Sequence, residues 1–501
     1  MEVKNNRKPY FLTILLLGLL VVTAFAQHRG DNLSFQGLEM DNEFGIRALG
    51  MGGAFVSVDS SYEALFYNPA GLAALDKFSI NIAGVYAKQD WWENQDYRPN
   101  RFFVTLPFYL EGLYIPDPAN NGRWDYEIAQ DSSYQVTPPR LGLEPHSKEA
   151  ADWTKNKTLS GPAMISAVLP FNLMNRQWTA AASVRLNERI WDYDRNDTYL
   201  DPHLGYNLYG NPGRVDGSDT VYVNWSRFLR SRFGDMTEIK LALGFNLHRR
   251  IQLGAGMTIS SGKTDDLLQL NRVGKFGLFD DNEFFFTYDT VNYRLEGESE
   301  FKSTKFNVGA LFTFDRFSFG FNVYLPYTYT RDYSYSQFYL DSLTQTTSQI
   351  SGTDEFKVPA SFSLGFNFRP IDQFRFAFDF ENRPYGKAEY SFAHSDSTFR
   401  KWVDVRILRF GIEFMPNRLI TLRSGYRNIP TSFVPDGAAI RNSGSNSQSY
   451  TMGLTLNLGK YGAIDYAMEW KRLKYYDSYY SNTNYVTETQ TRMFWGYRYS
   501  F

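Results

Sequence analysis

The feature that most constrains the fold is a strict alternation of apolar and polar residues along segments of eight to ten residues. In EIKLALGFNL (238–247), large apolar side chains occupy every second position from Ile239 to Leu247, and small or polar residues stand between them. The same pattern recurs in IQLGAGMTIS (251–260), QFRFAFDF (373–380) and YTMGLTLNL (450–458). A period of two places alternate side chains on opposite faces of a β-strand. Each of these strands therefore separates two different environments.

The length of these segments distinguishes a membrane barrel from a soluble β-sandwich. Sandwich strands have about 5–6 residues, whereas strands that cross a bilayer need about 9–11. The connections also alternate in length. Short turns fall at 172–177, 248–250, 315–316, 370–372, 416–418 and 459–460. Long polar segments rich in Tyr, Asn and Asp lie at roughly 189–236, 262–300, 329–353, 383–402, 428–447 and 473–488. Short periplasmic turns and long extracellular loops are typical of outer-membrane β-barrels, so the sequence predicts an all-β transmembrane antiparallel barrel.

The turns and loops predict about fourteen strands. Their expected positions are 78–88, 161–171, 177–188, 237–247, 251–261, 301–314, 317–328, 355–369, 373–382, 403–414, 418–427, 448–458, 461–472 and 489–501. An even number places both ends of the barrel in the periplasm, as in bacterial single-chain barrels. The segment RFFVTLPFYLEGLYI (101–115) also has strand character, but a further strand would make the number odd. We therefore expect this segment within the first extracellular loop.

The first 26 residues have the organisation of a secretory signal peptide. Lys4, Arg7 and Lys8 precede an apolar stretch at 11–22, and Ala24-Phe25-Ala26 follows as a cleavage site. This stretch is too short for a retained membrane helix. The chain contains no cysteine, so neither a lipid-anchor cysteine nor a disulfide framework is expected.

Composition and motifs exclude several classes of function. The formal net charge is −2, which gives no indication of a nucleic-acid partner. No window after the signal has 18 consecutive apolar residues, which excludes spanning helices. The GMTISSGKT stretch has the wrong glycine spacing for a phosphate-binding loop, and the five histidines are scattered. We therefore predict no enzyme activity, no cofactor and no metal site.

The stretch ALGMGGAFVSVDSSYEALFYNPAGLAAL (48–75) is rich in glycine and precedes the first predicted strand. About fifty residues between the signal and the barrel are too few for a separate core. A barrel of fourteen strands is also too wide for side chains alone to fill. We therefore expect residues 27–76 to form a hatch inside the lumen of a barrel at 77–501.

The same stretch resembles the N-terminal hatch signature of the FadL/TodX-type outer-membrane hydrophobic-compound transporters, and it also resembles PorV-type relatives. The resemblance is specific over about thirty residues and extends loosely over the barrel through the strand layout. The positions that match the hatch motif are Gly50, Gly52, Gly53, Asn68, Pro69, Ala70 and Gly71. The resemblance implies a plugged barrel for hydrophobic ligands. It gives no positions for the ligand-contacting residues.

The last strand, TRMFWGYRYSF (491–501), ends in an aromatic residue and carries aromatic side chains on one face. It resembles the signal read by the barrel insertion machinery of Gram-negative bacteria, which implies contact with that machinery during assembly. The same residues also suit a lipid-facing strand with an interfacial aromatic belt. Both interpretations place the chain in the outer membrane, in contact with its lipid.

Charged residues of both signs are expected on the inward face of the later strands. By parity this face carries Arg375, Asp379, Arg409, Glu413, Arg423, Arg427, Asp465, Glu469, Arg492 and Arg498. In a lumen of low dielectric constant such groups should pair with one another or with the backbone of the hatch. They form either a generic polar lining or a network that latches the plug. Mixed charge argues against a strongly ion-selective open pore.

The first extracellular loop contains aromatic residues where a polar loop is expected. They are Trp91, Trp92, Phe102, Phe103, Phe108 and Tyr109, followed by Leu110. An apolar cluster at a barrel mouth suits the capture of a hydrophobic ligand. The alternative is that these side chains pack on one another and hold the loop together.

Three functions are compatible with the sequence. The first is passive uptake of a hydrophobic small molecule such as a long-chain fatty acid. The second is a PorV-like component of a type-nine secretion system that receives secreted proteins. The third is a general porin or a structural barrel.

Overall fold

The computed structural model describes residues 32–39, 44–97, 143–203, 221–278, 284–287, 290–341, 343–394, 401–435, 438, 443–479 and 482–501. The predicted signal peptide and the segment 101–115 lie outside these residues. Within the described ranges, no helix is both long enough and apolar enough to cross a membrane.

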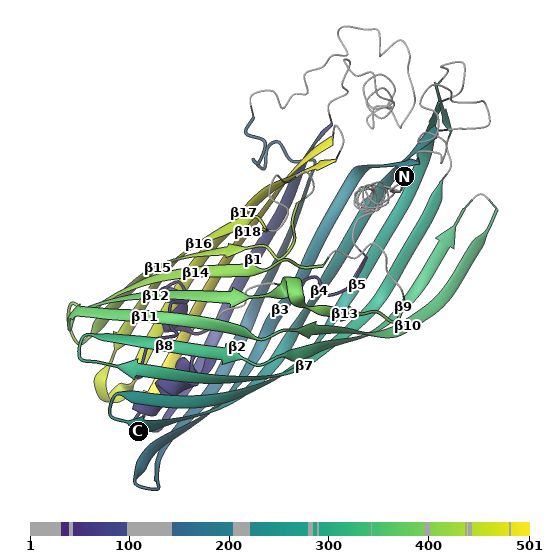
Figure 1. Cartoon of the computed structure of the whole chain (residues 1–501). Coiled ribbons are helices and arrows are strands. Elements are labelled where there is room, and N and C mark those ends of the chain that lie inside the picture. Colours follow the sequence, from purple (N-terminus) through teal and green to yellow (C-terminus); the bar gives the residue numbers. More distant parts are fainter. Residues whose placement is uncertain are drawn as a thin grey trace, which may run out of the picture.

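Eighteen labelled strands form one antiparallel sheet that closes on itself, because the first strand pairs with both the second and the last (Figure 1). The strands are β1 (Ser79–Tyr97), β2 (Trp153–Leu173), β3 (Arg176–His203), β4 (Val221–His248), β5 (Ile251–Leu278), β6 (Phe284–Thr287), β7 (Val291–Thr313), β8 (Phe317–Tyr324), β9 (Tyr327–Leu340), β10 (Gln345–Val358), β11 (Ser361–Ile371), β12 (Phe374–Arg383), β13 (Glu389–Ser391), β14 (Val405–Phe414), β15 (Ile420–Pro430), β16 (Asn446–Asn457), β17 (Ala463–Tyr479) and β18 (Asn482–Ser500).

These strands make a barrel of 14 strands, as the sequence predicted. β8 and β9 form one continuous strand with a break, and so do β10 and β11. A third such strand is β12 followed by β13, and β6 only adds a short ladder to the end of β5. Each of the three breaks contains a proline, namely Pro326, Pro359 or Pro384. Proline has no backbone N–H to donate to a ladder, so it interrupts the pairing at these positions.

The outer surface of the barrel carries the large apolar side chains. Leu169, Leu241 and Phe319 are 54%, 44% and 46% exposed, although a buried residue directly precedes each of them along its strand. The buried neighbours on the same strands are small or polar, such as Ser166, Ala242 and Ser318. An apolar outer band around a polar interior is the arrangement of a barrel in a bilayer.

The strands are longer than predicted on the side away from the short turns (Figure 1). The segments predicted as long loops at 189–236, 262–300 and 329–353 consist largely of strand, because β3, β5 and β9 continue to His203, Leu278 and Leu340. This part of the prediction is wrong for a physical reason. Beyond the bilayer the outer face no longer needs to be apolar, so polar residues occupy it, as Ser334 and Ser336 do beside Tyr333 and Tyr335, while the hydrogen-bond ladder continues. The abundance of tyrosine there is itself typical of strands.

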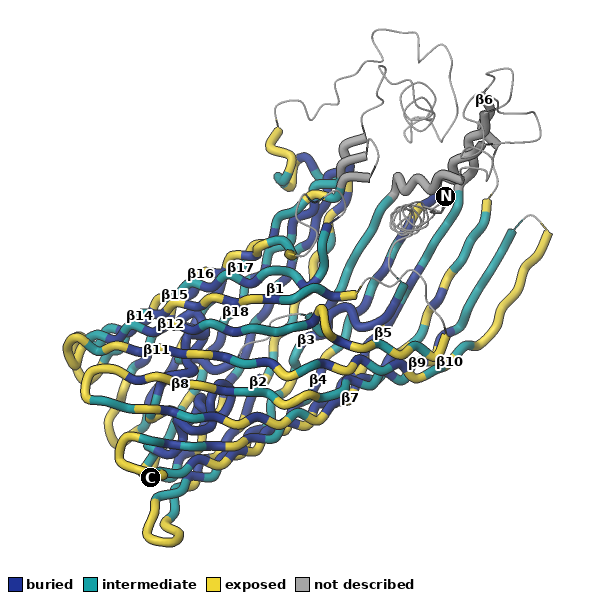
Figure 2. The backbone as a smooth tube through the Cα atoms, in the orientation of Figure 1, coloured by how far each residue is buried: buried dark blue, intermediate teal, exposed yellow. Residues whose placement is uncertain are grey.

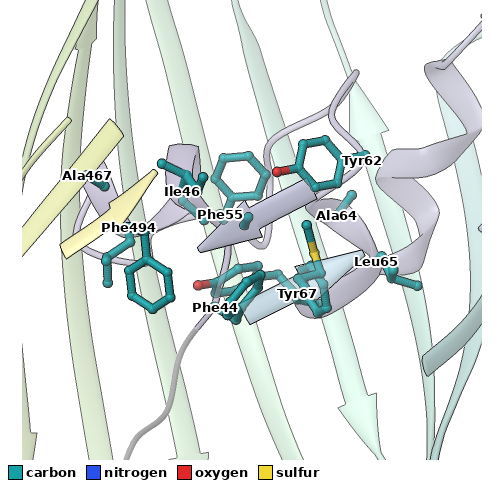
Figure 3. Packing of buried hydrophobic residues seen from close by; sticks show 14 of the residues in the cluster. Phe44, Ile46, Phe55, Tyr62, Ala64, Leu65, Tyr67, Ala467 and Phe494 are labelled. Carbon is teal, nitrogen blue, oxygen red and sulfur yellow. The ribbon is translucent and has the colours of Figure 1, made fainter. Parts of the chain in front are cut away.

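Residues 44–75 lie inside the barrel and form what we call the luminal segment (Figure 2). The segment contains the short helices α2 (Ile46–Gly50) and α3 (Ala64–Tyr67) and the 3₁₀ helix η1 (Pro69–Ala74). Two further 3₁₀ helices, η5 (Tyr385–Lys387) and η6 (Gly459–Tyr461), belong to the barrel connections. The apolar side chains of the luminal segment pack on one another and on the small inward residues of the wall, as Figure 3 shows for Ile46, Ala467 and Phe494.

Candidate ligand cavity in the lumen

The luminal segment is organised around the carboxylate of Glu63, which is fully buried. Its two oxygens accept hydrogen bonds from the backbone N–H groups of Arg47 (3.0 Å) and Ala48 (2.7 Å). Burial raises the pKa of Glu63, while these two N–H groups oppose the shift. The carboxylate thus accepts from two backbone N–H groups in the first turn of α2. The N-cap residue of this helix, Gly45, has no side chain that could do so.

Asn68 joins the luminal segment to the barrel wall. Its side-chain oxygen accepts from the N–H of Ala70 (3.2 Å), which caps η1, and Pro69 occupies the first turn of that helix. The side-chain amide donates to the carbonyls of Val56 (2.8 Å) and Ala310 (3.0 Å). One side chain therefore fixes a turn of the segment and connects it to β7.

The glycines of the motif allow the segment to approach the wall. Gly52 and Gly53 have φ angles of 66° and 77°, which favour glycine. A Cβ atom on Gly52 would lie 2.8 Å from the Phe410 carbonyl oxygen, and one on Gly50 would lie 3.0 Å from Cα of Gly453. Gly71 is packed within the segment, where a Cβ would lie 2.8 Å from the carbonyl oxygen of Val58.

Inward-facing glycines of the wall meet the segment from the other side. We call them the glycine belt: Gly244, Gly254, Gly309, Gly320, Gly365, Gly411, Gly425, Gly453 and Gly496. A Cβ on Gly254 would lie 2.4 Å from Ala70 N, and one on Gly425 would lie 2.1 Å from Gly52 N. The backbone of the segment therefore touches the backbone of the wall on many strands, and no side chains separate them there.

Part of the predicted lumen charge network also contacts the luminal segment. Glu413 receives two hydrogen bonds of 2.8 Å from the Arg47 guanidinium and one of 2.8 Å from Arg423. Asp379 accepts from the N–H groups of Phe55 and Val56. Arg375 lies 3.7 Å from Glu413 and 3.8 Å from Asp59 of the segment.

The other predicted charges bond to the wall. Glu469 pairs with Arg427 and with Arg492, the latter at 2.5 Å, and accepts from Ser449. Arg409 pairs with Glu381 at 2.6 Å, and Asp465 accepts from Thr455. Arg498 is half-buried and forms no ion pair within the described part of the chain. Apart from Arg498, the predicted residues thus divide between contacts to the luminal segment and a lining of the wall.

A cavity of about 200 Å³ lies above the luminal segment. Its floor is formed by Phe44, Val56, Phe66 and Tyr67. Gly37 and Leu38, from the described residues 32–39, also line it. Aromatic side chains of the barrel complete one side: Tyr327, Tyr329, Phe356, Tyr385 and Trp402. Most of this side is an apolar cluster that includes Phe356, Tyr385 and Trp402.

Two lysines line the cavity without a direct carboxylate contact, although Glu238, which also lines it, interacts electrostatically with both. Lys240 is 5% exposed, and among the described residues its ammonium group donates to the Phe66 carbonyl (3.3 Å) and the Tyr324 hydroxyl (3.4 Å). Lys305 donates to the Tyr329 hydroxyl at 2.5 Å. Neither lysine forms an ion pair with any described residue, whereas Arg185 beside them is paired with Glu188 and Glu238.

Residues 32–39 form a second luminal element, which we call the upper segment. The guanidinium groups of Arg232 and Arg331 both donate to the carbonyl of Ser34 at 2.7 Å. Arg232 is itself held by a two-bond contact to Asp266, at 2.8 and 2.7 Å, and both side chains are fully buried. Phe35 packs on Phe356 with ring centroids 5.3 Å apart. The upper segment is therefore clamped between charged and aromatic parts of the wall.

The wall is interrupted between β2 and β3. Their ladder ends at the pair Met164 and Arg185, although both strands continue well beyond it. At this end the Asn187 side chain donates to the Pro162 carbonyl at 2.7 Å. Farther along, aromatic side chains connect the two strands, and Trp153 donates to the Arg195 carbonyl at 2.9 Å. We call this interruption the β2–β3 seam.

Two of the six residues predicted to capture ligand are described, and both are buried. Trp91 is 2% exposed in a cluster with Trp153 and Trp191. Trp92 is 7% exposed, and its indole N–H donates to the His146 carbonyl at 2.9 Å. These positions favour the alternative of internal packing for this pair. Phe102, Phe103, Phe108 and Tyr109, together with Leu110, lie outside the described residues.

Of the charged residues that line the cavity, the sequence singled out Arg409 but not the two lysines. Lys240 and Lys305 could have been found by parity, because each alternates with lipid-facing residues on a predicted strand. Arg232, Asp266 and Arg331 could not be assigned a face, since they fall in segments that were expected to be loops. Among the described residues, no group of three or more His, Asp or Glu side chains is arranged to hold a metal ion.

Comparison with known proteins gives a fold. No family model matches the chain, and no curated protein matches it in sequence. A FadL homologue of Pseudomonas aeruginosa superposes with a TM-score of 0.56 at 14% identity, covering 91% of this chain and 98% of that one. The toluene transporter TodX of P. putida gives 0.55 at 13% identity, covering 92% and 99%. The monoaromatic hydrocarbon channel CymD gives 0.53 at 11%, covering 91% and 97%.

These similarities confirm the predicted resemblance at the level of the fold: the chain has the architecture of the FadL/TodX-type outer-membrane barrels. The three neighbours are described as transporters or channels or as a FadL homologue. None of them is described as an enzyme or as part of a secretion system.

Proposed function

We propose that this protein is an outer-membrane channel for passive entry of hydrophobic molecules, and that the cavity above the luminal segment is its ligand site. The observation that carries the proposal is the combination of an aromatic wall with the two unpaired lysines Lys240 and Lys305. Ligand sites are typically apolar pockets with a few convergent polar groups that fix orientation. The transporter and channel neighbours that share the fold support this proposal.

The two lysines favour an anionic amphipathic ligand, such as a long-chain fatty acid, over a neutral hydrocarbon. A buried charged group with no counter-charge in direct contact is costly, and Glu238, which interacts with both lysines at longer range, is already paired with Arg185. A carboxylate that bonds to Lys240 and Lys305 would compensate both ammonium groups, while the alkyl chain would lie on Phe356, Tyr385 and Trp402. A ligand such as toluene could use only the aromatic part of the site.

We propose further that the luminal segment is a plug that stays in place, and that ligand leaves through the β2–β3 seam. The close contacts between the segment and the glycine belt support a fixed plug. Arg185, Glu188 and Ile190 line the cavity beside the end of the β2–β3 ladder. The seam has side-chain contacts in place of a backbone ladder. Opening it therefore costs less free energy than separating two strands that are joined by backbone hydrogen bonds.

The ligand proposal is tested by removing the two ammonium groups. In the double variant Lys240→Met/Lys305→Met, binding of oleate to the purified protein should weaken by roughly tenfold or more, since hydrogen bonds to charged groups are worth about 1.5–3 kcal/mol. Binding of oleyl alcohol, which lacks the carboxylate, should change little. Lys263→Met is the matched control, because Lys263 is exposed on the outer face of β5.

Two results would contradict the proposal. If the double variant binds oleate as tightly as the control, the lysines do not bind the ligand. If oleate and oleyl alcohol lose affinity equally, the substitution acts on packing and not on charge recognition.

The exit proposal has its own test. Cysteines introduced at Gly161 and Asn187 should form a cross-link that lowers uptake of labelled oleate into cells, because a Cβ on Gly161 would lie 3.3 Å from the side-chain nitrogen of Asn187. Reduction of the disulfide should restore uptake. Full uptake through the cross-linked protein would exclude the seam as the exit.

A further inference from the structure

The lipid-facing wall of the barrel contains an apolar groove of about 670 Å³ that is separate from the lumen. We call it the alanine groove, because its floor consists of small residues on three strands: Ala167 on β2, Ala180 and Ala182 on β3, and Ala255 on β5. Larger side chains surround it: Phe78, Leu169, Leu241, Leu243, Met257 and Phe306. The rest of the lipid-facing wall mostly carries Leu, Ile, Phe and Tyr. The groove is therefore a local change in the shape of the surface that faces the bilayer.

The strand register places the small residues beside one another. Ala167 pairs with Ala182, and Leu169 pairs with Ala180. On the next strands, Leu241 and Leu243 pair with Met257 and Ala255. The groove thus crosses neighbouring strands in two successive rows.

An aromatic pair lies below the groove on the side of the short turns. Trp178 stacks on Phe245 with ring centroids 4.4 Å apart, and these residues are direct partners one row below Ala180. Aromatic side chains at this depth typically mark the interface between hydrocarbon and headgroups. The lower end of the groove therefore opens toward the headgroup region on the periplasmic side.

Basic residues follow directly below the aromatic pair. Arg176 begins β3, and Arg249 and Arg250 form the turn between β4 and β5. All three are exposed, and none forms an ion pair with a described residue. Arg250 lies over the ring of Phe314, 5.7 Å from its centroid. By contrast, Arg316 in the next turn is neutralised by Asp372 at 3.1 Å.

We propose that the alanine groove and these arginines bind one anionic phospholipid of the inner leaflet of the outer membrane. An acyl chain would fill the groove, and the phosphate would lie among Arg176, Arg249 and Arg250. The spacing suits this ligand: Leu173, which pairs with Arg176, lies four positions along the strand from Leu169, and four positions span about 13 Å. Basic residues beside an apolar surface at a headgroup boundary are the usual means of recognising anionic lipids.

The proposal is tested by native mass spectrometry of the full-length mature protein in a mild detergent. Dioleoyl phosphatidylglycerol should bind as one adduct that survives removal of other lipids, and dioleoyl phosphatidylcholine should not. Because one basic group near an anionic lipid contributes a factor of roughly five in affinity, Arg176→Gln/Arg250→Gln should weaken the phosphatidylglycerol adduct by roughly thirtyfold. The control is Arg418→Gln/Lys460→Gln, which removes two charges from turns on the far side of the barrel.

A second pair of variants tests the groove itself. Ala182→Leu fills the floor and should also displace the adduct, whereas Ser424→Leu adds similar bulk to the lipid-facing side of β15 and should not. Equal binding of phosphatidylglycerol by Ala182→Leu and Ser424→Leu would overturn the proposal. So would equal binding of the two lipids by the wild type. A change in oligomer mass in Ala182→Leu without loss of lipid would assign the groove to a second copy of the chain instead.

Discussion

The carboxylate of Asp379, on β12, accepts a hydrogen bond of 2.6 Å from the backbone N–H of Phe55 in the luminal segment. The same oxygen accepts a second one, of 2.8 Å, from Val56. Asp379 is fully buried, so its charge is held in the lumen by groups that include the backbone of the segment. One wall carboxylate thus fixes the position of a turn that is more than three hundred residues away in the sequence.

Replacing Asp379 by Asn should loosen the luminal segment while the barrel stays inserted. The neutral amide is a weaker acceptor and adds a donor that faces two backbone N–H groups. Hydrogen bonds to a charged group are worth about 1.5–3 kcal/mol, so a measurable part of this free energy is lost. Single-channel conductance in planar bilayers should rise. Asp372→Asn, in an exposed turn, is the control, and equal conductance of the two variants would show that Asp379 does not hold the segment.

Asn68→Ala should loosen the luminal segment more than Asp379→Asn does. The substitution removes the bonds to Val56 and Ala310 and the cap on Ala70, and it leaves the Ala310 carbonyl without that donor. Leakage of a small dye into cells should increase at unchanged abundance of the protein in the outer membrane. Asn81→Ala is the matched control, since buried Asn81 bonds only from β1 to Ser166 of β2. Unchanged leakage for Asn68→Ala would show that this side chain is not needed to hold the luminal segment in place.

Side chains on the glycine belt should displace the luminal segment. A Cβ on Gly425 would lie 2.1 Å from Gly52 N and 2.3 Å from the Met51 carbonyl carbon, and both are backbone atoms that cannot move alone. Gly425→Val should therefore make the segment accessible to limited proteolysis from the periplasmic side. In Gly161→Ala the new Cβ meets only the Asn187 side chain, at 3.3 Å, and protection should be kept. Equal protection in both variants would show that the belt does not position the segment.

The barrel could be predicted from the sequence because a bilayer imposes one repeated requirement on every strand. The outward residues from Ile239 to Leu247 must be apolar, and those between them must not be large and apolar. That requirement ends where the bilayer ends, so the aromatic and polar residues of β3 beyond Arg189 and of β9 beyond Thr330 were interpreted as loops. The predicted fourteen strands were correct, whereas their length was not.

The candidate site was less predictable, because it depends on which residues from distant strands meet at one height. Glu413 was expected to face the lumen, but nothing in the sequence pairs it with Arg47. The cavity requires the wall, the luminal segment and the upper segment together, and residues 32–39 carry no pattern that places them between Arg232 and Arg331. Parity gives the direction of a side chain, and only the register gives its neighbours.

The topology can be checked with single cysteines in this cysteine-free chain. Ser60→Cys places a thiol at an exposed position of the luminal segment, and Leu343→Cys places one in the turn between β9 and β10, where the residue is 94% exposed. On intact cells a membrane-impermeant maleimide should label Leu343→Cys and not Ser60→Cys. After the outer membrane is permeabilised, Ser60→Cys should react as well. Labelling of Ser60→Cys on intact cells would contradict the placement of the segment.

The last prediction concerns how pH affects docking of the upper segment through Glu39. Burial raises the pKa of Glu39 from 4.5 to about 8, and the nearby Asp192 acts in the same direction, while Arg230 opposes it. In the undocked chain the carboxyl group keeps its ordinary pKa, so docking is favoured at low pH, where Glu39 is protonated in both states. As pH rises from about 4.5 toward 8, the undocked state loses its proton and the docked state keeps it, which weakens docking progressively. Protection of the upper segment from proteases that tolerate this range should therefore fall between about pH 5 and pH 8. Glu39→Gln, which cannot ionise, should keep its protection across the same range, and a parallel decline in the wild type and in Glu39→Gln would show that another group controls the docking.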